Sequence, residues 1–210
     1  MSKETQRVEA IIGQEDVRRY ATAHRKFSGI MYRSFVKSVK KLGLSGRYLE
    51  MGAGPGFLAI MLAEQLPGID ITAVDLSPDM KAVAEEFIQE KKLENRINYI
   101  LGDAGDERLP EKLGMFDLVY TTFSMHHWKE PEKSIRNLWK AVRPGGALCI
   151  LDFHRIGWLC SLPVKLHVLE EFRRSYTGKE IKAMFLKMGV ANCQSKRPFP
   201  YFMQIAVARK

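Results

Sequence analysis

Three glycines on alternate positions mark the segment of this chain that is richest in chemical information. The segment reads Leu49-Glu50-Met51-Gly52-Ala53-Gly54-Pro55-Gly56-Phe57, with a strand-like run before the glycines and an apolar, helix-like run after them. Side chains at the glycine positions would keep the backbone away from a bound ligand. A carboxylate, Asp75, follows the next strand-like run at a spacing that suits hydrogen bonding to a ribose diol. The pattern therefore indicates a site for a nucleoside-bearing ligand.

The glycine spacing alone leaves the kind of nucleoside open. The dinucleotide fingerprint G-x-G-x-x-G has Phe57 in place of its third glycine when it begins at Gly52, and Ala59 when it begins at Gly54. Alanine is tolerated at that position, so a nicotinamide cofactor stays an alternative. No Gly-Lys-Ser or Gly-Lys-Thr follows, which excludes a P-loop.

Five segments in order resemble the motifs of class I S-adenosylmethionine-dependent methyltransferases. Glu50-x-Gly52-x-Gly54-x-Gly56 resembles the first motif, and the segment 74–80 resembles the acidic motif that follows it. The later segments are Gly102-Asp103-Ala104, 116–120 with Met125-His126-His127-Trp128, and Arg143-Pro144-Gly145-Gly146. The resemblance runs from about Tyr48 to Asp152 and is greatest to the small type 11 group, which includes quinone-biosynthesis methyltransferases.

This resemblance implies S-adenosylmethionine as cofactor, S-adenosylhomocysteine as product, and a defined set of contacts. The glycine loop would approach the methionine and ribose, Glu50 would order the loop or the methionine amino group, and Asp75 would accept hydrogen bonds from the ribose. Leu76 and Met80 would pack on the adenine. The full set implied for the cofactor is Glu50, Gly52, Ala53, Gly54, Gly56, Asp75, Leu76, Met80, Asp103, Ala104 and Thr121.

Four other residues are candidates for the acceptor side of the site. His126 and His127 follow the fourth predicted strand, where either could act as a general base near neutral pH or pack with Trp128. Tyr20 could contact the substrate or pack its helix on the domain, and His154 could bind an anion. Methyl transfer itself requires chiefly in-line placement of the acceptor. No compact spacing of metal ligands appears, so no metal is expected.

Alternating apolar segments predict an α/β fold with a Rossmann-like sheet and helices on both faces. The family resemblance adds that this sheet has seven mostly parallel strands and an antiparallel last strand. The helix beginning near Asp16 is predicted to break at Ser28-Gly29. The other predicted helices are 57–66, 78–92, 131–142, 164–174 and 178–188, and the predicted strands are 47–51, 69–75, 97–101, 116–121, 146–152, 190–194 and 201–208.

The length of 210 residues and the 46% hydrophobic content suit one globular domain. We expect an N-terminal helical cap (1–46), a cofactor-binding core (47–153), a lid or substrate segment (154–176), and a C-terminal helix with two strands (177–210). No apolar stretch is long enough to span a bilayer and no signal-peptide pattern is present, so a cytoplasmic location is expected.

The net charge of +9 is unevenly distributed. Residues 1–47 carry +7, residues 48–153 carry −6 and residues 154–210 carry +8. Basic flanks beside an acidic core indicate a substrate with carboxylate or phosphate groups, or a nucleic acid. The function expected overall is methyl transfer to a small anionic or aromatic acceptor. An RNA or protein methyltransferase and a non-catalytic cofactor-binding module are the alternatives. The segment Thr121-Thr122-Phe123-Ser124 lacks the Asn/Asp-Pro-Pro-aromatic motif of enzymes that methylate base amino groups, so nucleic acid is not favoured. The sequence does not predict the oligomeric state.

Overall fold

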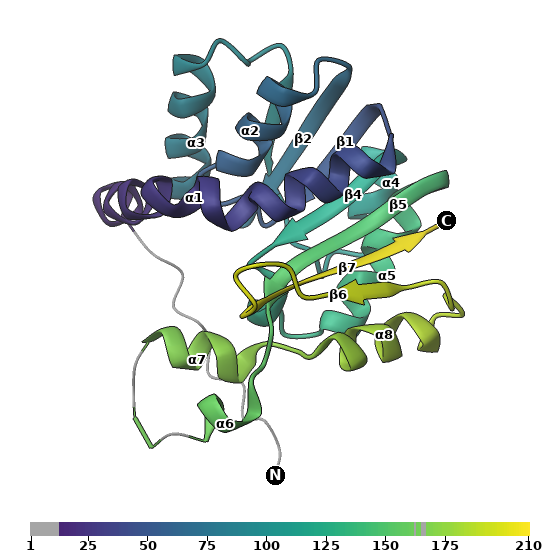
Figure 1. Ribbon diagram of the computed structural model, residues 1–210. Helices are drawn as coiled ribbons and strands as arrows, with labels where there is room; N and C mark the ends of the chain where they lie inside the picture. Colours follow the sequence, from purple (N-terminus) through teal and green to yellow (C-terminus); the bar gives the residue numbers. More distant parts are fainter. Residues whose placement is uncertain (1–12, 162, 165–166) are drawn as a thin grey trace.

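A seven-stranded sheet in the order β3-β2-β1-β4-β5-β7-β6 organises the computed structural model, which describes residues 13–161, 163–164 and 167–210 (Figure 1). The first five strands pair in parallel, and β7 is antiparallel to both β5 and β6. This confirms the predicted Rossmann-like sheet with an antiparallel last strand. The strands are β1 Gly46–Met51, β2 Ile69–Asp75, β3 Ile97–Leu101, β4 Phe116–Thr122, β5 Val142–Phe153, β6 Gln194–Lys196 and β7 Met203–Arg209.

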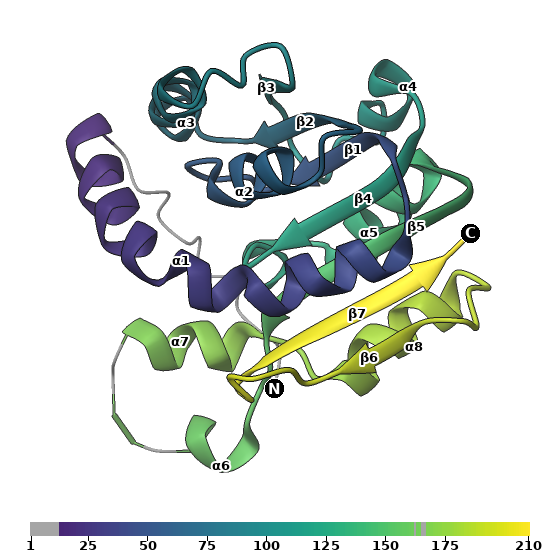
Figure 2. The ribbon, with the colours of Figure 1, turned by 45° about the horizontal axis from the view of Figure 1, so that its top comes forward.

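Helices cover both faces of the sheet (Figure 2). One apolar core lies between the sheet and the helices α1 (Gln14–Leu42), α2 (Phe57–Gln65) and α3 (Pro78–Glu90). A second core lies on the other face, under α4 (Leu109–Leu113), α5 (Pro131–Ala141) and α8 (Gly178–Lys187). Because β4 and the 146–152 part of β5 are mostly buried, these stretches are largely apolar, as is typical of parallel sheets.

The strand order reverses at β1, which pairs with β2 on one side and with β4 on the other. In open α/β sheets, ligands bind beyond the carboxyl ends of the strands at such a switch point. The short helices α6 (Gly157–Cys160) and α7 (His167–Arg174) follow the carboxyl end of β5 (Figure 1). The fold therefore brings the ends of β1, β2, β4 and β5 and the segment after β5 to one edge of the sheet.

Capping at two helices agrees with the sequence. The Ser77 hydroxyl accepts a hydrogen bond from the Met80 N–H, and Pro78 occupies the first turn of α3. The residue Gly189 follows α8 with a φ of +79°, which is the left-handed conformation that often ends a helix.

The N-terminal helix differs from the prediction, because α1 is continuous through Ser28 and Gly29. A glycine inside a helix costs about 1 kcal/mol relative to alanine. Packing on both sides of this point outweighs that cost, since Val17 and Ala21 pack with α3 and Phe35 lies in the core against the sheet. The predicted cap at Asp16 is also wrong: the helix starts after Gly13, whose N–H donates to Asp79 at 2.9 Å.

The C-terminal third shows further differences. The predicted strand 190–194 is wrong, since β6 begins only at Gln194; buried Val190 and Cys193 pack in the core as irregular chain. Residues 157–160 form α6 where a loop was predicted, and α4 was not predicted. Of the predicted helix 164–174, Val164 is not helical, residues 165–166 lie outside the described part of the chain, and α7 covers His167–Arg174. Among the described residues, no helix is long and apolar enough to cross a membrane.

A glycine at the start of β1 offers a test of this fold. Gly46 has a φ of +94°, and a Cβ there would lie 2.5 Å from Asp117 Oδ2, which accepts from the Arg47 N–H. We expect Gly46→Ala to lower the free energy of unfolding in urea by about 1–3 kcal/mol. Gly68→Ala is the matched control, because a Cβ at Gly68 would meet no atom within 4 Å. Equal stability of the two variants would contradict this account of the β1 start.

Candidate cofactor and acceptor site

The glycine loop joins β1 to α2 in a conformation that favours glycine. Gly52, Gly54 and Gly56 have φ values of +73°, +52° and +75°. A Cβ at Gly52 would lie 2.1 Å from Ser124 Oγ, so this loop lies directly against the loop that follows β4. The loop ends at the start of α2, where helix N–H groups lack partners within the helix. A backbone of this kind can approach a ligand closely.

Asp75, at the end of β2, fixes the glycine loop in place. Its Oδ2 accepts from the Gly54 N–H at 2.8 Å, and its Oδ1 accepts from the Ser77 N–H at 3.0 Å. An ionised carboxylate has about four acceptor positions, so capacity remains for a diol. The next residue, Leu76, is 70% exposed and provides apolar surface beside the acid. This pairing suits the ribose and base of a nucleoside.

The other predicted adenine and methionine contacts lie at the ends of β3 and β4. Asp103 accepts from the Gly105 N–H, and the buried Ala104 accepts from the Asn137 side chain through its carbonyl. Thr121 is fully buried, and its Oγ1 has no hydrogen-bond partner among the described residues. The Thr121 side chain therefore lies within the protein interior.

Glu50 is a buried acid directly below the glycine loop. Tyr120 donates its hydroxyl proton to Glu50 Oε2 at 3.2 Å. Burial, with a contribution from the charge of Asp75, raises the pKa of Glu50 from 4.5 to about 8. A cation beside this carboxyl would favour its ionised form. The Glu50 carboxyl therefore suits a ligand that carries an ammonium group, as the methionine part of S-adenosylmethionine does.

A buried polar chain lies beyond the ends of β4 and β5. The 3₁₀ turn Met125–His127 places His126 between two acids. His126 Nδ1 lies 2.6 Å from Asp152 Oδ1, and His126 Nε2 lies 2.5 Å from Glu171 Oε2 of α7. His127 Nε2 lies 3.4 Å from the same Glu171 oxygen. We refer to Asp152, His126, His127 and Glu171 as the histidine–carboxylate cluster.

The two histidines of the cluster differ in protonation. Burial lowers the pKa of His126, but the two carboxylates outweigh that effect and raise the pKa to about 9. Burial and the neighbouring His126 lower the pKa of His127 to about 4. At neutral pH His126 is therefore charged and His127 is neutral. The side chain of His126 is only 1% exposed, whereas that of His127 is 35% exposed.

Tyr20 of α1 is close enough to both halves of the site to be affected by their charges. Burial raises the pKa of Tyr20 to about 12, with contributions from the charges of Glu171 and Asp75. The Tyr20 ring packs on His24, with 4.3 Å between the ring centroids. The structure thus brings together three of the four residues predicted for the acceptor side. His154 is separate from the cluster contacts, because its Nδ1 pairs with Gln204 at 3.2 Å.

Glu171 was not among the predicted site residues. Its signal in the sequence was a carboxylate close to the apolar positions Leu169 and Phe172 of an amphipathic helix, and all three side chains are buried in the structure. Asp152, near the end of β5, is the other carboxylate of the cluster. The structure shows that both carboxylates bind His126.

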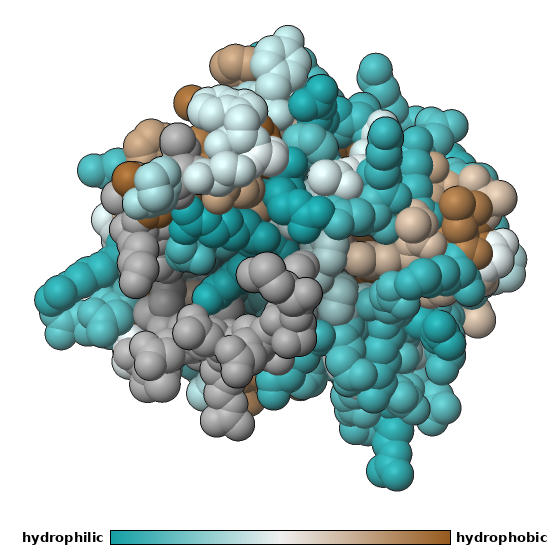
Figure 3. Space-filling view, turned by 90° about the horizontal axis from the view of Figure 1, so that it is seen from below, coloured by the Kyte–Doolittle hydropathy of each residue, from teal (hydrophilic) through white to brown (hydrophobic). Residues whose placement is uncertain are grey.

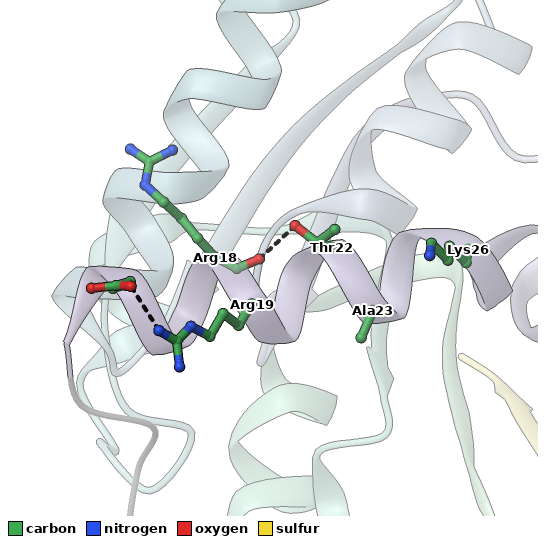
Figure 4. A pocket seen from close by; sticks show the side chains of 6 residues that line it. Arg18, Arg19, Thr22, Ala23 and Lys26 are labelled. Carbon is green, nitrogen blue, oxygen red and sulfur yellow. Dashed lines mark hydrogen bonds and ion pairs between the residues drawn. The ribbon is translucent and has the colours of Figure 1, made fainter.

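Two surface hollows lie apart from these residues. One, of about 430 Å³, follows the outer side of α1 past Arg18, Arg19 and Lys26 (Figure 4). The other, of about 750 Å³, follows α5 past Glu130 and Arg136. Neither is lined by the glycine loop or the cluster. The face seen in Figure 3, which includes α6 and α7, is mostly hydrophilic at its described residues.

Comparison with known proteins identifies a methyltransferase domain over residues 49–150. The demethylmenaquinone methyltransferase of Thermus thermophilus is 34% identical over 107 residues, which cover 51% of this chain and 47% of that protein. Phosphoethanolamine N-methyltransferase 2 of Caenorhabditis elegans is 27% identical over 182 residues, which cover 85% of this chain and 41% of that protein. The chain thus spans less than half the length of these curated relatives.

Solved structures share the fold at lower identity. A methyltransferase dependent on S-adenosylmethionine from Aquifex aeolicus has a TM-score of 0.70 and 17% identity, with 94% of this chain and 98% of that chain covered. Human N-acetylserotonin methyltransferase, solved with S-adenosylmethionine, has a TM-score of 0.73 and 19% identity, with 94% of this chain and 56% of that chain covered. With its motifs in order on this fold, the domain belongs to the class I S-adenosylmethionine-dependent methyltransferases, in the type 11 group.

Proposed function

We propose that this chain is an enzyme that transfers a methyl group from S-adenosylmethionine to a small anionic or aromatic acceptor. The observation that carries the proposal lies at the carboxyl edge of the sheet, where the glycine loop held by Asp75 lies against Ser124, directly before the turn that carries His126 and His127. A cofactor site and an acceptor site that share one boundary are what an in-line displacement requires.

The cofactor half would be formed by residues from the ends of the first four strands. We infer that Asp75 accepts from the ribose hydroxyls, Leu76 and Met80 pack on the base, and Asp103 and the Ala104 backbone bind its edge. Glu50 and the backbone at Gly52, Ala53, Gly54, Gly56 and Thr121 would surround the methionine part. When bound, the cofactor supplies an electrophilic methyl group on a positively charged sulfur.

Aromatic side chains beside the cluster support an aromatic acceptor. The rings of Phe123 and Phe153 lie 4.9 Å apart, and Phe153 lies 5.0 Å from Phe172 and 5.6 Å from His126. Tyr32 of α1 continues this series, 5.9 Å from Phe123. Flat rings of this kind pack well in offset or tilted arrangements. The names of curated relatives, which include a demethylmenaquinone methyltransferase and a norajmaline N-methyltransferase, agree with a small acceptor.

The main contribution that we expect from the side chains at the acceptor position is to hold the acceptor in line with the methyl group. Holding two reactants in line is worth about 7–11 kcal/mol in favourable cases. We infer that Tyr20 and His127 border the acceptor, since the charge of Glu171 acts on Tyr20, and His127 is partly exposed and lies 3.4 Å from Glu171 Oε2. We infer that they position the acceptor and exclude water, while His126 holds His127 and α7 in place.

The basic outer side of α1 raises a macromolecular acceptor as the second candidate. Arg18, Arg19 and Lys26 line one hollow there (Figure 4). However, Arg18 pairs with Glu86 at 2.5 Å and Arg19 pairs with Glu15 at 2.8 Å. These pairs offset part of the positive charge that a phosphate backbone would meet. The surface therefore favours the small acceptor over RNA.

Cofactor binding tests the proposed function. We expect calorimetric titration to show binding of S-adenosylmethionine and S-adenosylhomocysteine, and Asp75→Asn to weaken it by about 10- to 100-fold, because charge-assisted hydrogen bonds contribute about 1.5–3 kcal/mol. Asp70→Asn is the matched control, since Asp70 lies on the same strand away from the glycine loop. Binding of NADH in place of both sulfur nucleosides would instead indicate an oxidoreductase.

The raised pKa of Glu50 predicts a dependence of stability on pH. The folded protein favours the neutral acid, so this group stabilises the fold below about pH 4.5, and that contribution is lost as the pH rises to about 8. Glu50→Gln stays neutral and avoids this loss. We expect the free energy of unfolding of Glu50→Gln, relative to that of wild type, to increase between pH 5 and pH 8 by at most about 1.4 kcal/mol per pH unit.

Urea unfolding at several pH values measures this difference. Glu64→Gln is the control, because Glu64 lies on the surface and pairs with Lys91 at 2.8 Å. A constant difference between Glu50→Gln and wild type across this range would show that Glu50 is ionised in the folded protein at every pH tested.

A further inference from the structure

We propose that His126, His127 and Glu171 bind a divalent transition-metal ion of the Zn²⁺ class beside the acceptor position. Two imidazoles and one carboxylate form a ligand set that suits such ions. One ligand atom from each of the three residues lies within 4.8 Å of the others. The ligands come from the turn after β4 and from α7, which the fold brings together at the carboxyl edge of the sheet.

One of the three ligand separations already matches that of a tetrahedral site. With metal–ligand bonds of about 2.0–2.1 Å, two ligand atoms of a tetrahedral ion lie about 3.3 Å apart. His127 Nε2 and Glu171 Oε2 are already 3.4 Å apart. His126 Nε2 is closer to that oxygen, at 2.5 Å, where the two atoms share a proton. An ion would replace that proton, and the His126–Glu171 separation would open by somewhat less than 1 Å.

A second carboxylate already orients the ligand His126. His126 Nδ1 donates to Asp152 Oδ1 at 2.6 Å, which directs Nε2 toward Glu171 and His127. The other oxygen of Asp152 accepts from the His126 backbone N–H at 3.2 Å, so both the ring and its backbone are held. Metal-bound histidines commonly donate their second nitrogen to a carboxylate in this manner. The side chains of His126 and Asp152 are only 1% and 2% exposed, which keeps this orientation fixed.

Three protein ligands leave one position of a tetrahedral ion open. That arrangement is typical of catalytic rather than structural zinc sites. His127 is the most exposed of the three, at 35%, so the open position is expected on its side of the cluster. An acceptor with an anionic oxygen, such as a phenolate or a carboxylate, would fit this position beside the aromatic rings. This statement about the acceptor rests on the proposed function, whereas the statement about the metal does not.

The spacing of these ligands along the chain explains why no metal was predicted from the sequence. His126 and His127 are adjacent, but Glu171 follows only after the whole of α5 and β5. No metal was expected because the ligands form no compact motif in the sequence. The proposed site replaces that expectation.

Metal binding to the full chain tests the inference directly. After treatment with a chelator, the protein is titrated with Zn²⁺ by calorimetry and with Co²⁺ by visible absorption. We expect one ion per chain, with the Co²⁺ bands of a four-coordinate site. Glu171→Gln and His127→Asn should each weaken binding by at least about 10-fold. The controls are Glu170→Gln, which pairs with Arg173 in the same helix, and His24→Ala on α1, and both should bind like wild type.

Two results would overturn the inference. One is the absence of binding of either ion, and the other is binding that Glu171→Gln and His127→Asn leave unchanged. Circular dichroism of each variant verifies that it is folded, and His127→Asn, at a partly exposed position, keeps the test decisive if Glu171→Gln unfolds. Titration of S-adenosylhomocysteine into the metal-free protein separates this test from that of the proposed function, because cofactor binding depends on Asp75 and not on the cluster.

Discussion

The position of β1 between β2 and β4 is the constraint on which the whole site depends. Parallel pairing in register brings Met51, Val74 and Thr121 to the same level of the sheet, so the loops that follow the three strands meet. The contact between Gly52 and Ser124 is the direct result, since it joins the loop after β1 to the loop after β4. Through Asp75, the end of β2 holds the same glycine loop from the other side.

Buried polar groups are stabilising in this position only because each has a partner. Asp152, His126 and Glu171 lie in a nearly dry environment, where an unpaired charge would cost several kcal/mol. The chain of hydrogen bonds satisfies them and joins β5, the turn after β4 and α7. A network with this connectivity fixes the relative positions of its elements more strictly than apolar contacts do.

Local signals in the sequence were sufficient to predict the form of the glycine loop and the acid beside it. Glycines that need left-handed backbone, an acid at a strand end, and a Ser77–Pro78 helix start all act over a few residues, and the structure contains each of them. The proposed acceptor half depends on contacts between distant segments. Glu171 is one of several charged residues in an amphipathic helix, and its role follows only from the packing of α7 against the turn Met125–His127. Ser28-Gly29 is typical of a helix break, but contacts with α3 and the sheet keep α1 continuous there. Such long-range packing leaves no local pattern.

The insertion of β7 between β5 and β6 has a consequence for the order of assembly. Residues 203–209 pair with β5 along seven positions, and β6 pairs with β7 alone among the described strands. During synthesis, β5 is therefore complete while one of its edges still lacks a partner. An unpaired apolar edge of this kind is prone to pair with other chains. Pairing with β7 therefore covers the edge of the strand that carries Asp152.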